Sequence, residues 1–234
     1  MELLNKDEFF SLAIHLDLPD LLRLCSSNKI IQQKLCGKDE IWLYKLEKDF
    51  PNYRILNIEN KSKKEIYELL YSLTILKHKL NIKQNVYHLY TTDKLGVVDK
   101  NLSEIPKELG LLINLRILHL SFNHLKKIPE ELGSLTKLHT LYLSHNELEK
   151  IPKEIGNLVN LRVLVLNDNK LLEIPKEFGN LINLSVLQLS NNKLTQLPKE
   201  IGNLKNLRRL ELSNNEIKEI PEDLLKNYNL KITK

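Results

Sequence analysis

The chain has 234 residues and a mass of 27.4 kDa, with 42% hydrophobic and 28% charged residues. This balance is typical of one or two globular domains, and a content of 7 glycines and 8 prolines excludes collagen-like and low-complexity proteins. Lys and Arg total 35 against 30 Asp and Glu, with the two signs interleaved along the chain. Because phosphate contacts require a clustered basic surface, this pattern argues against a nucleic-acid-binding protein.

No apolar run approaches the length of a membrane span, and the first residues do not resemble a secretory signal. We therefore expect a cytoplasmic protein that has no contact with a membrane. The two cysteines, Cys25 and Cys36, are expected to be reduced, buried thiols, which excludes a secreted protein.

The first fifty residues predict a small helical domain. Their pattern of apolar, acidic and proline residues indicates three short helices, over 7–16, 19–25 and 28–35. The only tryptophan, Trp42, follows the third helix. The simplest interpretation is a helical cap with Cys25 and Trp42 in its core.

The order of the residues in this segment resembles an F-box, the motif that docks the small adaptor subunit of cullin–RING ubiquitin ligases. The resemblance depends on Leu-Asp-Leu-Pro-Asp-Leu-Leu-Arg-Leu-Cys at 16–25, followed by Ile-Trp at 41–42. The chain departs from the family at Asn5, where proline is usual, and at Ile31, where an aromatic residue is common. The resemblance implies that the apolar residues of an all-α domain over 1–50 bind the adaptor, namely Leu4, Phe9, Leu12, Leu18, Pro19, Leu21, Leu22, Leu24 and Ile31.

A longer helix is predicted in the segment 51–91. Ser-Lys-Lys-Glu at 62–65 is a capping box, in which the serine and glutamate side chains satisfy backbone groups at a helix start. Apolar residues then fall on one helix face. We expect this helix and the segment to about Tyr90 to form a connector that covers the first edge of the domain that follows. The apolar residues are Ile66, Leu69, Leu70, Leu73 and Leu76.

A 23-residue repeat occupies the domain 92–234. Six prolines, five glycines and five asparagines each recur at this spacing. One unit reads Leu-x-x-Leu-x-Leu-x-x-Asn-x-Leu-x-x-Ile-Pro-x-Glu-Ile-Gly-x-Leu-x-x, which resembles the intracellular 23-residue leucine-rich repeat. Five complete units run from Leu115 to Asn229. A unit that departs from the consensus precedes them, and Leu230 starts a truncated one. The recurring residues are Pro106, Pro129, Pro152, Pro175, Pro198 and Pro221, Gly110, Gly133, Gly156, Gly179 and Gly202, and Asn123, Asn146, Asn169, Asn192 and Asn215.

Each recurring residue has an expected physical role. Leu141 and Leu143 alternate with Tyr142, as in a short strand that buries every second side chain. Asn146 can bond backbone groups of the turn that follows, and Gly156 is expected to adopt a positive φ where a short helix ends. A single unit cannot bury enough apolar surface to fold alone, so the units must stack. The sequence thus predicts an α/β leucine-rich-repeat solenoid, curved, with a parallel sheet on its concave face.

On the concave face, the third, fifth, seventh and eighth residues of each unit are expected to be exposed. Across the units they form an apolar island with a polar rim, which is typical of a protein interface. The alternative is that the repeat has diverged at these positions without a role in binding, and that β-branched residues occur there because they favour strands. The predicted target-binding residues are Ile117, Phe122, Tyr142, Val163, Val165 and Val186 in the apolar island and His119, His145, Gln188, Arg209 and Glu211 in the polar rim.

The sequence contains no motif for catalysis or for a cofactor. It has no Gly-rich phosphate loop, no Cys or His cluster at metal-ligand spacing and no nucleophile motif, so no enzyme, cofactor or metal site is expected. His119 and His145 are expected near each other on the sheet, but no carboxylate or cysteine is placed beside them to complete a metal site.

Two functions are open at this point. An F-box followed by leucine-rich repeats resembles the substrate receptors of ubiquitin ligases, which implies two partners, the adaptor subunit and an unknown target protein. The composition of the sequence, together with Lys-Asp-Phe-Pro at 48–51, also resembles that of F-box proteins of large amoebal DNA viruses, which act in the host cell cytoplasm. The alternative is a protein-binding scaffold in which the helical domain is only an N-terminal cap. The C-terminal edge, covered only by Leu224, Leu225 and Tyr228, is expected to favour weak self-association.

Overall fold

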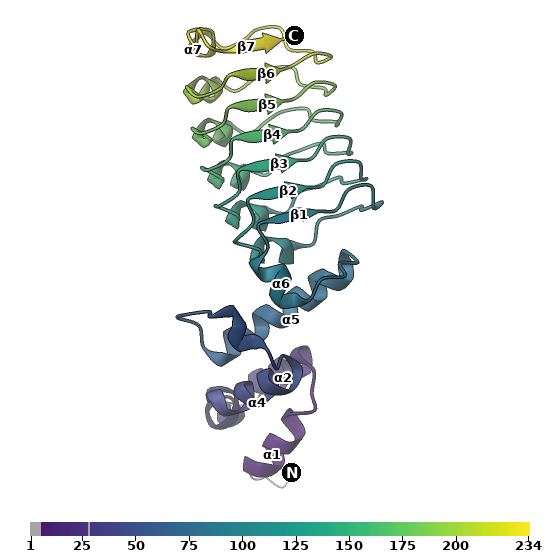
Figure 1. The fold of residues 1–234 in the computed structure, drawn as a ribbon, viewed down its shortest axis with the longest axis vertical. Coiled ribbons are helices and arrows are strands. Elements are labelled where there is room, and N and C mark those ends of the chain that lie inside the picture. Colours follow the sequence, from purple (N-terminus) through teal and green to yellow (C-terminus); the bar gives the residue numbers. More distant parts are fainter. Residues whose placement is uncertain (1–5, 28) are drawn as a thin grey trace. The chain divides into compact units, whose positions relative to one another are not determined.

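The computed structural model describes residues 6–27 and 29–234, which form two compact units (Figure 1). The first unit ends at Leu89 and the second runs from Tyr90 to Lys234, close to the predicted boundary between 91 and 92. None of the helices in the described ranges is long and apolar enough to cross a membrane.

The first unit is helical, but its helices differ from those predicted. The third predicted helix is a short α3 that continues as a π-helical turn, η1, and Trp42 lies within a further helix, α4, that was not predicted. The elements are α1 (Lys6–Ala13), α2 (Leu18–Ser27), α3 (Lys29–Ile31), η1 (Gln32–Cys36), α4 (Asp39–Asp49), the 3₁₀ turn η2 (Tyr53–Leu56), α5 (Lys63–Lys79) and α6 (Val86–Thr91).

The capping box before α5 is confirmed. The Glu65 backbone N–H donates to Ser62 Oγ (3.3 Å), and the Ser62 backbone N–H donates to Glu65 Oε2 (2.8 Å). This reciprocal pair satisfies two backbone donors at the helix start. The hydrogen bonds that the Glu65 carboxylate accepts from Ser62 lower the pKa of Glu65.

One hydrophobic core joins the segments 1–50 and 51–91, which the sequence treats as separate domains. Leu21 of α2 and Ile41 of α4 are fully buried together with Leu70 of α5. Tyr67 of α5 lies within the same core, with its ring centroid 6.0 Å from that of Trp42. The connector is therefore part of the helical unit, because α4 cannot bury its apolar face without α5.

A buried lysine accompanies this core. Lys45 of α4 is 3% exposed, and its Nζ donates to the Leu16 carbonyl (2.8 Å) and lies 3.5 Å from Asp49 Oδ2. The Tyr67 hydroxyl donates to the same carboxylate oxygen at 2.6 Å. Burial, aided by this hydrogen bond, raises the pKa of Tyr67 well above its usual range.

The expectation of reduced cysteines is wrong, because Cys25 and Cys36 form a disulfide. The end of α2 and the end of η1 bring their Cα atoms to 5.9 Å, within the range that a disulfide can bridge. No spacing rule identifies such a pair in a chain with only two cysteines. Since disulfides persist mainly in oxidising compartments, the cysteines no longer support a cytoplasmic location.

The second unit is the predicted solenoid. Its seven strands form one parallel sheet in chain order, and the chain returns between strands through 3₁₀ turns on the side away from the sheet (Figure 1). The strands are β1 (Lys94–Gly96), β2 (Ile117–His119), β3 (Thr140–Tyr142), β4 (Val163–Val165), β5 (Val186–Gln188), β6 (Arg209–Glu211) and β7 (Lys231–Thr233). The turns are η3 (Lys107–Leu111), η4 (Glu130–Ser134), η5 (Lys153–Asn157), η6 (Lys176–Asn180) and η7 (Lys199–Asn203), with a short α7 (Glu222–Leu225) in the last unit.

The alternation predicted for the strands and the asparagine ladder are both confirmed. Leu141 and Leu143 are buried, whereas Tyr142 is partly exposed. Asn146 is 8% exposed and bonds backbone groups of its own unit and of the preceding one. The leucines and asparagines therefore hold each unit against the next.

The role predicted for the glycines is wrong. No glycine in the described chain has a positive φ. A Cβ added to Gly156 would instead lie 2.6 Å from the Glu177 carbonyl oxygen of the next unit, so the residue is small because two units meet there. The left-handed conformation occurs at the eighth residue of each unit, as at Phe122 and His145.

The register of the last strand also differs from the prediction. Lys231 of β7 is paired with Arg209 of β6, a step of 22 residues rather than 23. At this end Leu224 is buried, while Leu225 is 58% and Tyr228 98% exposed. The predicted cover of the C-terminal edge is thus provided by Leu224, and the predicted self-association there stays a prediction.

Candidate protein-binding face

The exposed face of the sheet β1–β7, called the sheet face below, brings the predicted target-binding residues into rows. Ile117, Val163, Val186 and Arg209 share one row across β2–β6, because they are level in the parallel register. A second row contains His119, Tyr142, Val165, Gln188 and Glu211. Neighbouring strands lie about 4.8 Å apart, so residues in a row are in reach of one another.

The residues of the apolar island differ in their exposure to solvent. Phe122 is 53% exposed, and Ile117, Tyr142, Val163 and Val186 are half-buried.

Val165 corrects the prediction, because it is only 7% exposed. Its short side chain lies in register between the longer Tyr142 and Gln188. Val165 is therefore a packing residue of the sheet rather than a contact residue for a partner.

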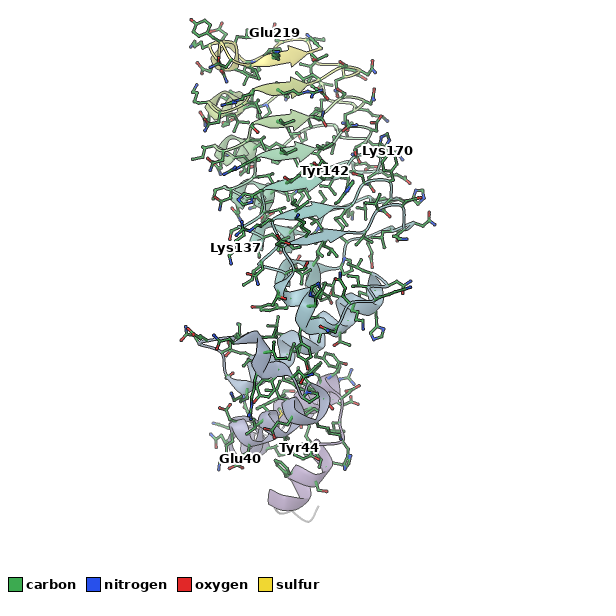
Figure 2. The ribbon with its side chains drawn as sticks, viewed as in Figure 1. Glu40, Tyr44, Lys137, Tyr142, Lys170 and Glu219 are labelled. Carbon is green, nitrogen blue, oxygen red and sulfur yellow. A yellow bond between two sulfur atoms is a disulfide. The ribbon has the colours of Figure 1, made fainter. Side chains whose placement is uncertain are left out.

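Aromatic and imidazole rings gather over β2 and β3. The rings of His119 and Tyr142 are 4.8 Å apart, and those of Phe122 and His145 are stacked at 4.3 Å with an interplanar angle of 15°. Figure 2 labels Tyr142, which lies over the middle of the sheet. Such rings offer large, rigid contact areas at a low cost in side-chain entropy.

Phe122 is held in an unusual backbone conformation. Its φ is 59°, in the left-handed region that bulky residues seldom adopt, whereas Asp168, Asn191 and Asn214 fill the same position in other units. Asparagine and aspartate enter this region readily because their side chains bond the local backbone. A φ in this region costs free energy at a phenylalanine, and with 53% of the residue exposed Phe122 gains little from burial.

From His145 onward, the eighth residues of successive units are polar and contact one another. His145 Nε2 lies 3.4 Å from Asp168 Oδ2, and Asn191 Nδ2 donates to Asp168 Oδ1 at 2.7 Å. The chain of contacts continues from Asn214 Nδ2 to Asn191 Oδ1 at 2.6 Å.

The last three residues of the predicted polar rim also contact one another. Gln188 Nε2 donates to Glu211 Oε2 at 2.7 Å, and Arg209 Nε donates to Glu211 Oε1 at 2.6 Å. The polar rim is thus divided between an imidazole end and a paired polar end.

Two recurring features of the repeats were missed at the level of sequence. The last residue of a unit forms a second asparagine ladder, in which Asn160 Nδ2 donates to the Thr136 carbonyl and Asn183 Nδ2 to the Val159 carbonyl, both at 2.8 Å. The second residue of a unit is often arginine. Both features recur every 23 or 46 residues, so the period itself could have revealed them.

The residues of the predicted adaptor-binding surface are divided between core and surface. Leu18, Leu21 and Ile31 are buried in the helical core, whereas Leu12 is 47% exposed and Pro19 is exposed. Leu22 and Leu24 are half-buried. Leu4 lies outside the described residues, as does the side chain of Phe9.

An open cavity of about 640 Å³ adjoins this part of the helical unit. Its lining includes Pro19 and Leu22 together with the disulfide of Cys25 and Cys36 and the ring of Trp42. The Trp42 indole N–H donates to the Cys36 carbonyl at 2.8 Å.

The described residues contain no group of three or more His, Cys, Asp or Glu side chains that could hold a metal ion. The His119 ring is tilted against that of Tyr142, and the His145 ring stacks on that of Phe122. The expectation that no carboxylate lies beside these histidines is wrong for His145, whose Nε2 is 3.4 Å from Asp168 Oδ2.

Comparisons with known proteins agree with this architecture. A family model described as a leucine-rich repeat region matches residues 94–190, and a leucine-rich repeat model matches residues 183–204 and 206–227. Residues 94–227 are therefore leucine-rich repeats, as predicted. These matches do not reach the first unit, so the F-box interpretation and the viral origin stay predictions. A search of curated proteins finds no match.

Several solved structures resemble the repeats. A leucine-rich-repeat protein of Leptospira interrogans is 41% identical, with a TM-score of 0.59, over 64% of this chain and 39% of its own. The structure of PEPR1–AtPEP1 is 37% identical, with a TM-score of 0.55, over 59% of this chain and 20% of its own. The plant peptide hormone receptor RGFR1 in complex with RGF2 is 36% identical, with a TM-score of 0.54, over 59% and 23%. The chain thus spans about two fifths of the first and less than a quarter of the other two.

Proposed function

We propose that the chain is a non-enzymatic scaffold that binds a protein segment on its sheet face. The observation that carries this proposal is Phe122, which is 53% exposed, adopts a left-handed φ and stacks on His145. A phenylalanine at this position strains the backbone and exposes an apolar ring, and a bound partner would remove that ring from water.

The neighbouring residues and the similar structures support the same proposal. Tyr142 and the half-buried Ile117, Val163 and Val186 extend the apolar surface across β2–β5. A central apolar area with polar surroundings is the usual organisation of a protein interface. The receptor RGFR1, whose repeats resemble these, is described in complex with a peptide hormone.

The test is a selection of random 12-residue peptides displayed on phage, followed by titration of one enriched peptide. Phe122→Glu/Tyr142→Glu is expected to lower the affinity for that peptide by about tenfold or more, since central aromatic residues dominate interface energies. Val165 is unsuitable for this test because its burial makes a substitution a test of stability.

A matched control places the same charges outside the sheet face. Leu172 and Val159 are 53% and 43% exposed and belong to neither row of the sheet face. Leu172→Glu/Val159→Glu should leave the affinity within about twofold. Equal losses in both double variants, or no enriched peptide, would overturn the proposal.

Adaptor docking by the helical unit is a second candidate function, in which the chain acts as substrate receptor of an F-box-type ubiquitin ligase. The observation that favours it is the exposed Pro19 beside the partly exposed Leu22 at the rim of an open cavity. The alternative, a helical domain that only caps the solenoid, leaves these two residues without a partner. This candidate function includes the predictions of a cytoplasmic location and of a viral origin.

The deciding measurement is a titration of the purified chain against the ligase adaptor subunit. Pro19→Ala/Leu22→Glu serves as the variant, because both residues lie at the surface. Submicromolar binding that this variant loses while still folded would support the receptor. Absence of binding by the folded wild-type chain would leave the capped scaffold. The titration is run with and without reductant, since the Cys25–Cys36 disulfide lines the same cavity.

A further inference from the structure

A row of arginines runs beside the sheet face. Arg116, Arg162 and Arg208 each directly precede a strand, β2, β4 and β6 respectively, and all three are exposed. The strands between them are preceded by His139 and Ser185, so no carboxylate interrupts the row. We call these three residues the arginine row.

The arginine row has no carboxylate partner in the described part of the chain, although exposed acids are common in the repeats. Arg209, one residue further on, is bound to Glu211, and Lys170 is paired with Glu147 at 2.8 Å. Among the described residues, exposed lysines such as Lys193 and Lys199 also lack an ion pair, so the arginine row is distinguished by its guanidinium groups and by its place beside the sheet face. Arginine favours carboxylates because its planar group can donate two parallel hydrogen bonds to one.

The 3₁₀ turns carry charges of both signs. The seventeenth residue of every unit is acidic, and these residues lie in the turns away from the sheet, or in α7 in the last unit (Figure 1). Exposed lysines directly precede four of these residues, at Lys107, Lys153, Lys176 and Lys199, so the turns carry mixed charge whereas the arginine row is cationic. The acidic residues are Glu108, Glu131, Glu154, Glu177, Glu200 and Asp223.

We propose that the target segment on the sheet face is acidic, with Asp or Glu side chains that pair with the arginine row and apolar side chains that contact the apolar island. This inference rests on the proposed function and names the chemistry of its partner. The arginine row spans four strand spacings, about 19 Å, which matches about six residues of an extended chain.

The peptide selection described above tests the composition of the partner. Enriched peptides should contain more Asp and Glu than the unselected library, together with apolar residues. Arg116→Glu/Arg162→Glu/Arg208→Glu should lower the affinity for an enriched peptide by about tenfold or more. Added salt should lower the affinity of the wild-type chain for the same peptide. Arg116→Gln/Arg162→Gln/Arg208→Gln, which removes the charge and adds none, should show a smaller loss in the same direction.

A matched control carries the same change in net charge on the 3₁₀ turns. Lys153, Lys176 and Lys199 are exposed at one position of three successive units. Lys153→Glu/Lys176→Glu/Lys199→Glu should leave the affinity within about twofold, because these residues lie in the turns η5, η6 and η7, away from the sheet face. Thermal unfolding of each variant confirms that it is folded.

The possible failures are distinct. Enriched peptides without an excess of acidic residues, or equal losses in the two charge-reversed variants, would overturn the acidic partner and leave the proposed function intact. Binding that is insensitive to Phe122→Glu/Tyr142→Glu would overturn the proposed function itself. A labelled single-stranded oligonucleotide of 12 nucleotides is measured in parallel. Its binding at the affinity of the peptide, lost in the arginine variant, would assign the arginine row to nucleic acid.

Discussion

Asn146 shows why asparagine recurs at the ninth residue of each unit. Its Oδ1 accepts a hydrogen bond from the Leu125 backbone N–H, and its Nδ2 donates to three carbonyl oxygens, including that of Leu120 in the preceding unit. Because the side chain is buried, these backbone groups have no access to water. One amide thus satisfies polar groups of two units at once.

Asn146→Ala is expected to lower the free energy of unfolding by about 2–3 kcal/mol, since it leaves several buried backbone groups unpaired. Asn160→Ala in the second ladder is the matched control. Asn160 is exposed and makes one hydrogen bond, to the Thr136 carbonyl, so the expected loss is below about 1 kcal/mol. Urea unfolding of both variants gives the two values, and equal losses would contradict this account of the ladder.

Gly156 gives a second prediction at the scale of a residue. Gly156→Ala would place a Cβ 2.6 Å from the Glu177 carbonyl oxygen, so the two units must separate slightly, at a cost of about 1–3 kcal/mol. A Cβ at Gly96 meets nothing within 4 Å, which makes Gly96→Ala a neutral or stabilising control. Thermal unfolding compares the two, and a Gly156→Ala protein as stable as the wild type would exclude close packing as the reason for the glycine.

At the scale of an element, the disulfide determines how α2 is held against η1. It joins residues 11 apart in sequence, and both cysteines are 6% exposed in the helical core. The single tryptophan, Trp42, is buried beside it and reports on the helical unit alone.

Cys25→Ser/Cys36→Ser is therefore expected to lower the stability of the helical unit by about 2–3 kcal/mol, because the unfolded chain gains the freedom of an open loop. Trp42 fluorescence during urea unfolding measures the change. A reductant should shift the wild-type transition by a similar amount and leave that of the variant unchanged. Two free thiols in the unfolded, unreduced protein would show that the disulfide does not form.

At the scale of the whole molecule, the open prediction concerns the first edge of the repeats. Solenoid ends expose apolar surface unless a cap covers them, and the sequence predicts that residues 63–90 provide this cap. Limited proteolysis should then fail to release a stable repeat domain. Clean cleavage between 60 and 92 that leaves a soluble, folded fragment of 92–234 would contradict the prediction.

Much of the repeat domain follows from the sequence. Each unit places the same residue types in the same environments, so a period of 23 residues identifies the leucines of the core and the asparagines of the ladder without any knowledge of the rest of the chain. The composition of the sheet face could also be predicted, because the exposed positions of a strand alternate with its buried ones. The helical unit has no such repetition, and α4 and the shared core with α5 were missed.

By itself, the sequence determined the repeat, its parallel sheet and the polar and apolar rows that the sheet displays. Only the tertiary structure decided that Cys25 meets Cys36, that Val165 is covered by its neighbours, and that Gly156 is small because Glu177 lies against it. The physical reason is the range of the interactions. Periodicity and alternation are local properties of the backbone, whereas a disulfide, the exposure of a side chain and the contact between units depend on atoms that the fold brings together.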